Sequence, residues 1–288
     1  MIRDFFQNWL NFIFGNGMFS MCQEILNLNP SSGSYATIWR VISGVYENVC
    51  VPIGMGLVLI YFMVNLIERS MQQQQIDVEQ VVKLLLKLAF GLYFIENGLE
   101  LMSQLYSMGI SFLNSIIDAN SVDGATAGEA IVHGMWTSLT GEAWEGSWNV
   151  LDIIVKGVPL LLMLLIPFLG MFIITLICIA VCYFRLIEFY VMTCAAPIAM
   201  SDFFTEGTHS NGWRFVKNYI AIALQMGIIM LALIAFSGIM AGITPSAISG
   251  WTLIMIIWFW IEYLALGAAC CAVLLKSRSI AKEIVGVQ

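Results

Sequence analysis

Charged side chains stand inside the apolar segments of this chain, and their spacing limits the chemistry they can perform. Arg185 and Glu188 lie three residues apart in one apolar stretch, and Glu262 stands alone in another. Residues three apart share a face of a helix, so Arg185 and Glu188 can form a structural ion pair or a polar patch at a pore or protein contact. A lone carboxylate in a membrane helix must be protonated or must meet a partner, and we consider Arg185 as the partner of Glu262.

A second pair of carboxylates lies earlier in the chain. Glu96 and Glu100 are four residues apart, and Lys83 and Lys87 fall roughly on the opposite side of the same helix. The lysines are near the expected inner end, where they can extend to the membrane surface. The glutamates are deeper and need water or a partner chain around them. A water-lined surface, interhelical packing and a different span boundary all stay open.

No catalytic or metal-binding motif accompanies these charges. His133 and His209 are isolated, and the sequence contains no HExxH, nucleophile elbow, P-loop or DDxxD. We therefore expect no enzymatic activity, no catalytic residue, no cofactor and no bound metal.

The seven cysteines form no CxxC pair and are expected to be small packing residues. Five of them lie in or near apolar segments: Cys178, Cys182, Cys194, Cys270 and Cys271. The other two, Cys22 and Cys50, can lie on the same non-cytoplasmic side, so a disulfide between them stays open.

The elements that position these residues are membrane helices. The 288 residues are 60% hydrophobic and only 11% charged, whereas a soluble domain carries about 25% charged residues. Four apolar segments approach or exceed the roughly 20 residues that a span requires: 51–67, 157–184, 219–242 and 251–275. We expect an all-α polytopic protein of the cell membrane with about 4–6 membrane-embedded helices.

The basic residues set the orientation of these helices in the membrane. Segment 118–152 has no Lys or Arg but six acidic residues, so it is expected outside. The linker after Met200 carries Arg214 and Lys217, and the tail after Leu275 is also basic, so both are expected inside. The pattern predicts an N-terminus outside and a cytoplasmic C-terminus.

Two segments are too long for one simple crossing. As a single helix, 77–117 would reach about 60 Å, twice the hydrocarbon core, so it either projects from the membrane, lies partly in the interface or breaks near 96–98. Segment 153–202 must cross an odd number of times. We expect one long crossing followed by a half-span over 184–201 that ends or bends at Pro197.

The chain divides into five expected parts. They are an amphipathic interfacial segment outside (1–48), two spans joined by a Gln-rich cytoplasmic linker (49–117), an acidic outer loop (118–152), a membrane core (153–276) and a basic cytoplasmic tail (277–288). The outer loop contains Trp136, Trp144 and Trp148. Tryptophans at this spacing indicate an interface belt or, alternatively, a surface that binds a partner.

Several glycines in the apolar segments are suited to close helix contact, although such patterns also occur by chance. They are Gly54, Gly56, Gly227, Gly238 and Gly242.

One composite pattern resembles a known family. The stretch "FRLIEFYVMTCAAPIAM" (184–200), followed after a polar linker by "GWRFVKNYIAIALQMGIIML" (212–231), is similar to the core of TrbL proteins. These are polytopic inner-membrane channel components of conjugative type IV secretion systems. The resemblance covers 150–275, is looser before 120, and is to the compact Gram-positive form without long extra domains. Its motif residues are Arg185, Glu188, Pro197, Trp213, Lys217 and Gln225.

The resemblance implies an integral membrane subunit that forms or anchors a channel for export of single-stranded DNA and its relaxase. It implies a homo-oligomer that works with other secretion-system subunits and separate ATPases. Such a subunit contacts lipid and, transiently, single-stranded DNA. The resemblance implies no small-molecule substrate. An acidic chain suits a conduit that does not retain its cargo, because phosphate binding needs Lys and Arg.

Two other functions stay open on the residues alone. One is a secondary transporter or ion channel that uses Glu96, Glu100, Glu262 and Arg185 as a proton or ion relay. The other is a non-conducting membrane scaffold. A transporter often shows an internal repeat, and the sequence has no second copy of the unit formed by Arg185, Glu188 and Pro197.

Overall fold

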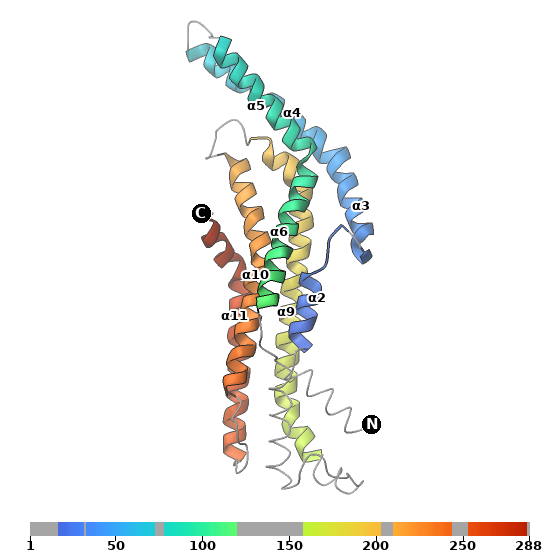
Figure 1. The fold of residues 1–288 in the computed structure, drawn as a ribbon, viewed down its shortest axis with the longest axis vertical. Coiled ribbons are helices and arrows are strands. Elements are labelled where there is room, and N and C mark those ends of the chain that lie inside the picture. The colour runs from blue at the N-terminus through green and yellow to red at the C-terminus, as the bar shows by residue number, and fades with distance from the viewer. Residues whose placement is uncertain are drawn as a thin grey trace. The chain divides into compact units, whose positions relative to one another are not determined.

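The computed structural model describes residues 17–31, 33–72, 78–119, 158–202, 210–243 and 253–286 (Figure 1). Throughout these ranges the secondary structure is helical, without a strand. The α-helices are α2 (Gly17–Leu26), α3 (Ala36–Val45), α4 (Val51–Gln72), α5 (Val78–Glu96), α6 (Gly98–Ala119), α9 (Val158–Met200), α10 (Asn211–Ile243) and α11 (Leu253–Val285). A 3-10 helix (Gly33–Tyr35) precedes α3, and a π-helix (Tyr46–Cys50) joins α3 to α4.

Four helical segments within the described ranges are long and apolar enough to cross a membrane. They are Ala36–Glu68, Phe168–Met200, Asn211–Ile239 and Ile257–Val285. The predicted all-α polytopic membrane protein is therefore confirmed. Residues 1–16 of the expected amphipathic segment (1–48) and residues 120–152 of the acidic outer loop (118–152), with all three of its tryptophans, lie outside the described residues.

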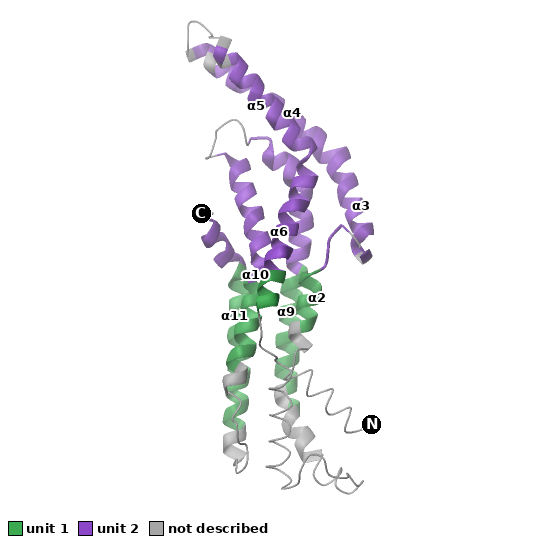
Figure 2. Ribbon diagram, in the orientation of Figure 1, with its two compact units in different colours: residues 1–27, 114–183, 228–277 green, residues 28–113, 184–227, 278–288 purple. Residues whose placement is uncertain are grey.

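Two compact units make up the chain (Figure 2). Unit 1 comprises residues 1–27, 114–183 and 228–277, and unit 2 comprises residues 28–113, 184–227 and 278–288. Each unit has a buried apolar core. That of unit 1 includes Leu26, Met171, Leu233, Tyr263 and Leu274, and that of unit 2 includes Tyr46, Met102, Phe189, Tyr219 and Met226.

Close packing of α9 against α11 shapes unit 1. A Cβ atom on Gly170 would collide with the Leu264 side chain, and one on Gly267 would lie 2.6 Å from Cδ1 of Ile174. Between the same helices, the Sγ atoms of Cys178 and Cys271 lie 4.0 Å apart. All seven thiols of the chain are free, those of Cys22 and Cys50 included.

A widened helical turn joins α3 and α4. In the π-helix Tyr46–Cys50, the N–H of Val51 donates to the carbonyl of Tyr46, five residues back. Pro52 follows at once, and a proline ring clashes with the carbonyl four residues back in a regular helix, here that of Asn48. The wider turn accommodates this proline and leaves Tyr46 pointing into the core of unit 2, 1% exposed.

The helix over 77–117 breaks at Asn97, which confirms one of the three alternatives for this segment. α5 ends at Glu96 and α6 begins at Gly98. The hydroxyl of Tyr46 donates to the carbonyl of Ile95 at 2.8 Å, next to the break. A Cβ atom at residue 98 would collide with the same hydroxyl, so a glycine there lets Tyr46 reach the backbone.

The expected half-span over 184–201 is wrong as a separate element. α9 is one uninterrupted helix of 43 residues that runs through this stretch to Met200. Such a helix is about 65 Å long, roughly twice the hydrocarbon core, so one crossing accounts for the excess residues without a second element. Pro197 lies in the last turn, where it removes one bond to the carbonyl four residues back, yet the helix continues to Met200.

Candidate functional site around a buried arginine

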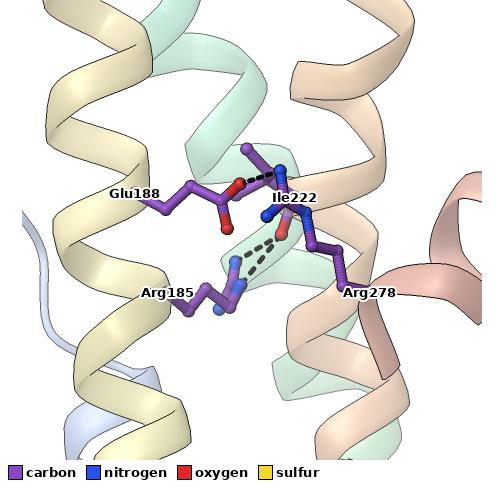
Figure 3. A network of polar contacts seen from close by, with 4 residues as sticks. All are labelled: Arg185, Glu188, Ile222 and Arg278. Atoms are coloured by element: carbon purple, nitrogen blue, oxygen red, sulfur yellow. Dashed lines mark hydrogen bonds and ion pairs between the residues drawn. The ribbon is translucent and has the colours of Figure 1, made fainter. Parts of the chain in front are cut away.

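A buried arginine holds three helices of unit 2 together. Arg185 on α9 is 2% exposed. Its Nε and Nη2 atoms both donate to the carbonyl oxygen of Ile222 on α10, at 2.9 and 2.6 Å (Figure 3). Its guanidinium carbon lies 6.0 Å from the ring centroid of Tyr106 on α6. A cation at this distance from an aromatic ring is attracted to it, so α6 and α10 both help to stabilise the buried charge.

The Ile222 carbonyl can accept these bonds without breaking α10. A carbonyl oxygen has two lone pairs, and an α-helix uses one of them for the N–H four residues ahead. The guanidinium takes the second. This contact fixes Arg185 through a backbone atom, so it depends on the spacing of α9 and α10 rather than on the side chain at Ile222.

Aromatic rings and hydroxyls extend this core. The Phe189 ring lies 4.2 Å from that of Tyr106 and 5.8 Å from that of Tyr219, measured between centroids. The Tyr219 hydroxyl donates to the carbonyl of Met102 at 2.9 Å. It also lies 3.2 Å from Oγ1 of Thr193, and since its own proton goes to Met102, Thr193 is the donor in that bond. The core is therefore packed with aromatic rings and satisfied hydroxyls.

Two glycines let the helices of unit 2 approach closely. A Cβ atom on Gly109 of α6 would lie 2.7 Å from the carbonyl oxygen of Ala223 on α10. One on Gly54 of α4 would lie 2.7 Å from the carbonyl oxygen of Pro197 on α9. Of the glycines singled out in the sequence, Gly54 thus makes a close contact. Gly56 and Gly238 have open space beside them, and Gly109 was missed.

Glu188 forms an ion pair with the C-terminal end of α11. Its Oε1 atom lies 2.6 Å from Nη2 of Arg278, and the two side chains are 11% and 44% exposed (Figure 3). The sequence interpretation used Arg278 only to orient the tail and missed it as a partner of Glu188. The predicted pair between Arg185 and Glu188 stays a prediction.

Of the remaining motif residues, Pro197 lies in the last turn of α9, and the other three lie on α10. Pro197 and Gln225 are buried, and Trp213 and Lys217 are half-buried. The backbone N–H of Trp213 donates to Oγ of Ser210 at 3.2 Å, which is an N-cap of α10. The side chain of Asp202, at the end of α9, accepts from the N–H of Asn211 at 3.3 Å. These polar contacts fix the start of α10, with Trp213 in its first turn, next to the end of α9.

The predicted intramembrane glutamates lie on exposed helix surfaces. Glu96 on α5, Glu100 on α6 and Glu262 on α11 are all exposed. Glu262 belongs to unit 1 and Arg185 to unit 2, so their predicted pairing stays a prediction. The candidate outer surface of Trp136, Trp144 and Trp148 lies outside the described residues. In the described part of the chain, no group of three or more His, Cys, Asp or Glu could hold a metal.

The chemistry open to this arrangement is that of a fixed charge. Arginine keeps its proton at any accessible pH, so Arg185 cannot relay protons. Its Nε and Nη2 atoms donate to a backbone oxygen and its guanidinium carbon lies over an aromatic ring, and both contacts hold it in place. The site therefore fixes helix positions around a buried positive charge.

The model of a family described as "TrbL/VirB6 plasmid conjugal transfer like protein" matches residues 18–197. The match includes Arg185, Glu188 and Pro197 and covers the first half of the chain, where the resemblance had been expected to be looser. It ends before Trp213, Lys217 and Gln225. No curated protein and no solved structure matches the chain.

Proposed function

The chain belongs to the TrbL/VirB6 family of plasmid conjugal transfer-like proteins, and we propose that it forms or anchors the cytoplasmic-membrane channel of a conjugative DNA-transfer apparatus. Family membership and the four apolar helical segments make it a multi-pass membrane component of a conjugation, or type IV secretion, system. Its role as the channel body is the proposal. The observation that carries it is the family match over residues 18–197.

The buried core around Arg185 supports a structural role within that channel. A charge inside a membrane protein is costly and usually serves a function. Here the charge contacts a backbone carbonyl and an aromatic ring, and it is not exposed at a surface where it could bind a solute. We infer that it fixes α6, α9 and α10 in one arrangement, as a channel wall requires.

The cargo that we propose is single-stranded DNA with its attached relaxase. The chain has 19 acidic and 12 basic residues, so it offers few sites to hold phosphate groups. Weak contact favours passage over retention. Because the sequence lacks a P-loop, separate ATPases must supply the energy, and we propose that copies of the chain assemble with these and other secretion-system subunits.

A transporter or ion channel that uses intramembrane carboxylates remains the second candidate. The exposed positions of Glu96, Glu100 and Glu262 favour it. A relay through Arg185 does not fit, since that side chain is buried and permanently charged. A non-conducting scaffold is the third candidate, and it differs from the first in that no residue of this chain would meet the cargo.

The test is the transfer frequency of the conjugative element after in-frame deletion of this gene. We expect transfer to be lost and then restored by the wild-type chain supplied in trans. Photo-crosslinkers placed at Glu100 and Glu262 should then capture transferring DNA if the chain lines the channel. Transfer that continues at the wild-type frequency after deletion would rule the proposal out, and restored transfer without crosslinks would favour the scaffold.

A further inference from the structure

One side of α6 carries an exposed row of polar side chains, which we call the polar stripe. It consists of Glu100, Gln104, Ser107 and Ser111, all exposed and spaced by four, three and four residues. Side chains at this spacing lie above one another on one face of a helix. In sequence the row continues to Ser115 and Asp118 near the end of α6, and Glu96 precedes it across the break at Asn97.

The opposite side of α6 is packed into the core of unit 2. Its buried residues are Gly98, Met102, Tyr106, Gly109 and Leu113. The Met102 carbonyl accepts the Tyr219 hydroxyl, and Gly109 lies against Ala223. Both partners belong to α10, within the candidate span Asn211–Ile239. α6 therefore lies beside a membrane span and at its depth.

The charge pattern also requires α6 to be in the membrane. The end of α4 carries Arg69 and is expected on the inner side, whereas the acidic segment 118–152 is expected on the outer side. The chain between them must then cross the membrane once, and none of the four apolar segments lies in that interval. The chain from Val78 to Ala119 supplies the missing crossing, although it is too polar to be counted among the four.

Lipid can solvate only part of this stripe. The hydroxyls of Ser107 and Ser111 donate to carbonyls of their own helix, at 2.7 Å to Gln104 and 3.0 Å to Ser107, so serines at these positions tolerate lipid. Gln104 and Glu100 differ. The Gln104 amide donates to the Glu100 carboxylate at 3.3 Å, which leaves most of the hydrogen-bonding capacity of both groups open. These two side chains need water or a polar partner.

A second exposed row on α6 is apolar and lies next to the stripe. Met108 and Phe112 are 65% and 40% exposed, and Leu101 and Leu105 on the same side are half-buried. The exposed surface of α6 is thus divided lengthwise into an apolar edge and a polar one. The apolar edge can contact lipid or an apolar face of another helix. The polar edge can be covered only by water or by a surface with complementary polar groups.

We propose that the polar stripe of α6 lines a water-filled path through the membrane, enclosed by copies of this chain. The inference rests on the proposed channel function and names the helix face that would form the channel wall. One helix cannot enclose water, so several copies must contribute. The stripe has one carboxylate, that of Glu100, and no basic residue, so two stripes facing one another repel at short distance and need water between them. The apolar edge supplies the surface through which neighbouring copies can pack.

The first test measures water access along α6. Single cysteines replace Gln104, Ser107 and Ser111 on the stripe, and Leu105, Met108 and Phe112 on the apolar edge as matched controls. Inverted membrane vesicles are treated with a charged, membrane-impermeant thiol reagent, and the unsubstituted chain gives the background of the seven native cysteines. We expect labelling several-fold faster at the stripe than at the edge. Equal rates on both rows, or no labelling on the stripe, would overturn the proposal.

The second test identifies what encloses the path. Ser107→Cys and Ser111→Cys variants are treated with bifunctional maleimides of increasing length, and the products are sized by blotting. Products at multiples of the chain mass are expected. Products that contain a different protein, or monomer alone at both positions with every linker, would show that copies of the chain do not enclose the stripe. Equal amounts of each variant in the membrane fraction are the control for folding.

The two tests can be separated from the proposed function because neither requires DNA transfer. If labelling follows the stripe but deletion leaves transfer unchanged, the water-filled path stands and the conjugation role fails. If deletion abolishes transfer but labelling ignores the stripe, the conjugation role stands and this helix face is not the wall.

Discussion

The hydroxyl of Tyr46 donates a hydrogen bond to the backbone carbonyl of Ile95, 2.8 Å away and 49 residues along the chain. This one contact joins the π-turn before α4 to the break between α5 and α6. Both irregularities are therefore stabilised by the same bond. Gly98 is part of the arrangement, since any larger residue there would collide with the hydroxyl.

Tyr46→Phe and Gly98→Ala should each destabilise unit 2, and the double variant should recover part of the loss. The phenylalanine leaves a buried carbonyl without its partner, which costs about 1–3 kcal/mol of unfolding free energy. The alanine methyl collides with the hydroxyl, and removing that hydroxyl makes room for it. Thermal unfolding of the detergent-solubilised protein measures the stability of the two single variants and of the double variant. Gly44→Ala, with open space at that position, is the control, and strictly additive losses would contradict the shared contact.

Gly54→Ala should destabilise the protein, whereas Gly56→Ala, two residues further along α4, should not. A methyl group at Gly54 would lie 2.7 Å from the Pro197 carbonyl oxygen, a backbone atom that cannot easily move. Nothing lies within 4 Å of the corresponding position at Gly56, and alanine is favoured over glycine in a helix by about 1 kcal/mol. The melting temperatures of the two variants, each compared with that of the unsubstituted protein, test this difference. A pair of equal shifts would mean that α4 and α9 are not in close contact there.

Arg185→Met should lower transfer frequency more than it lowers stability. Methionine removes the cost of desolvating a buried charge, and the Ile222 carbonyl that loses the guanidinium keeps its other lone pair for the bond within α10. We expect normal membrane levels, an unchanged or raised unfolding temperature and impaired transfer. Ile187→Met, at an exposed position on the same helix, is the control. If transfer falls only in proportion to the protein level, Arg185 serves stability alone.

Reversing both charges of the Glu188–Arg278 pair should restore what either single reversal removes. Arg278 is 44% exposed, so the pair contributes only about 0–1 kcal/mol, and that contribution weakens at high salt. The sensitive readout is protection of the C-terminal tail from protease in inverted vesicles. Both single variants should be cleaved faster than the double variant. A double variant cleaved as fast as the worse single one would show that the pair does not hold the tail.

The fold class and the location of one helix break could be predicted from sequence because both depend on local composition. Long apolar segments require a membrane whatever their neighbours are. The residues at 96–98 are polar and include a glycine within an otherwise continuous helical pattern, and the helix breaks at Asn97. The half-span was wrong because counting residues against bilayer thickness cannot tell a second element from one helix that is longer than a single crossing needs, such as α9.

The details of the Arg185 site could not be predicted, because its main partner is a backbone atom. Every residue has a carbonyl, so nothing in the sequence marks Ile222 as the acceptor. The pairing of Glu188 with Arg278 joins residues that are 90 positions apart, and only the packing of α9 and α11 brings them together. Gly109 was overlooked because it stands in a polar segment, where close helix contact was not expected.

The π-turn at Tyr46–Cys50 also sets the rotational phase between α3 and α4. One additional residue in a turn rotates everything after it by about 100° around the helix axis. Deleting a single residue from this turn would leave the composition of the span almost unchanged, yet it would rotate Gly54 away from Pro197 relative to Tyr46. The length of this segment is therefore as strictly determined as the identity of its residues, and a shortened chain should still insert into the membrane while losing the contacts of unit 2.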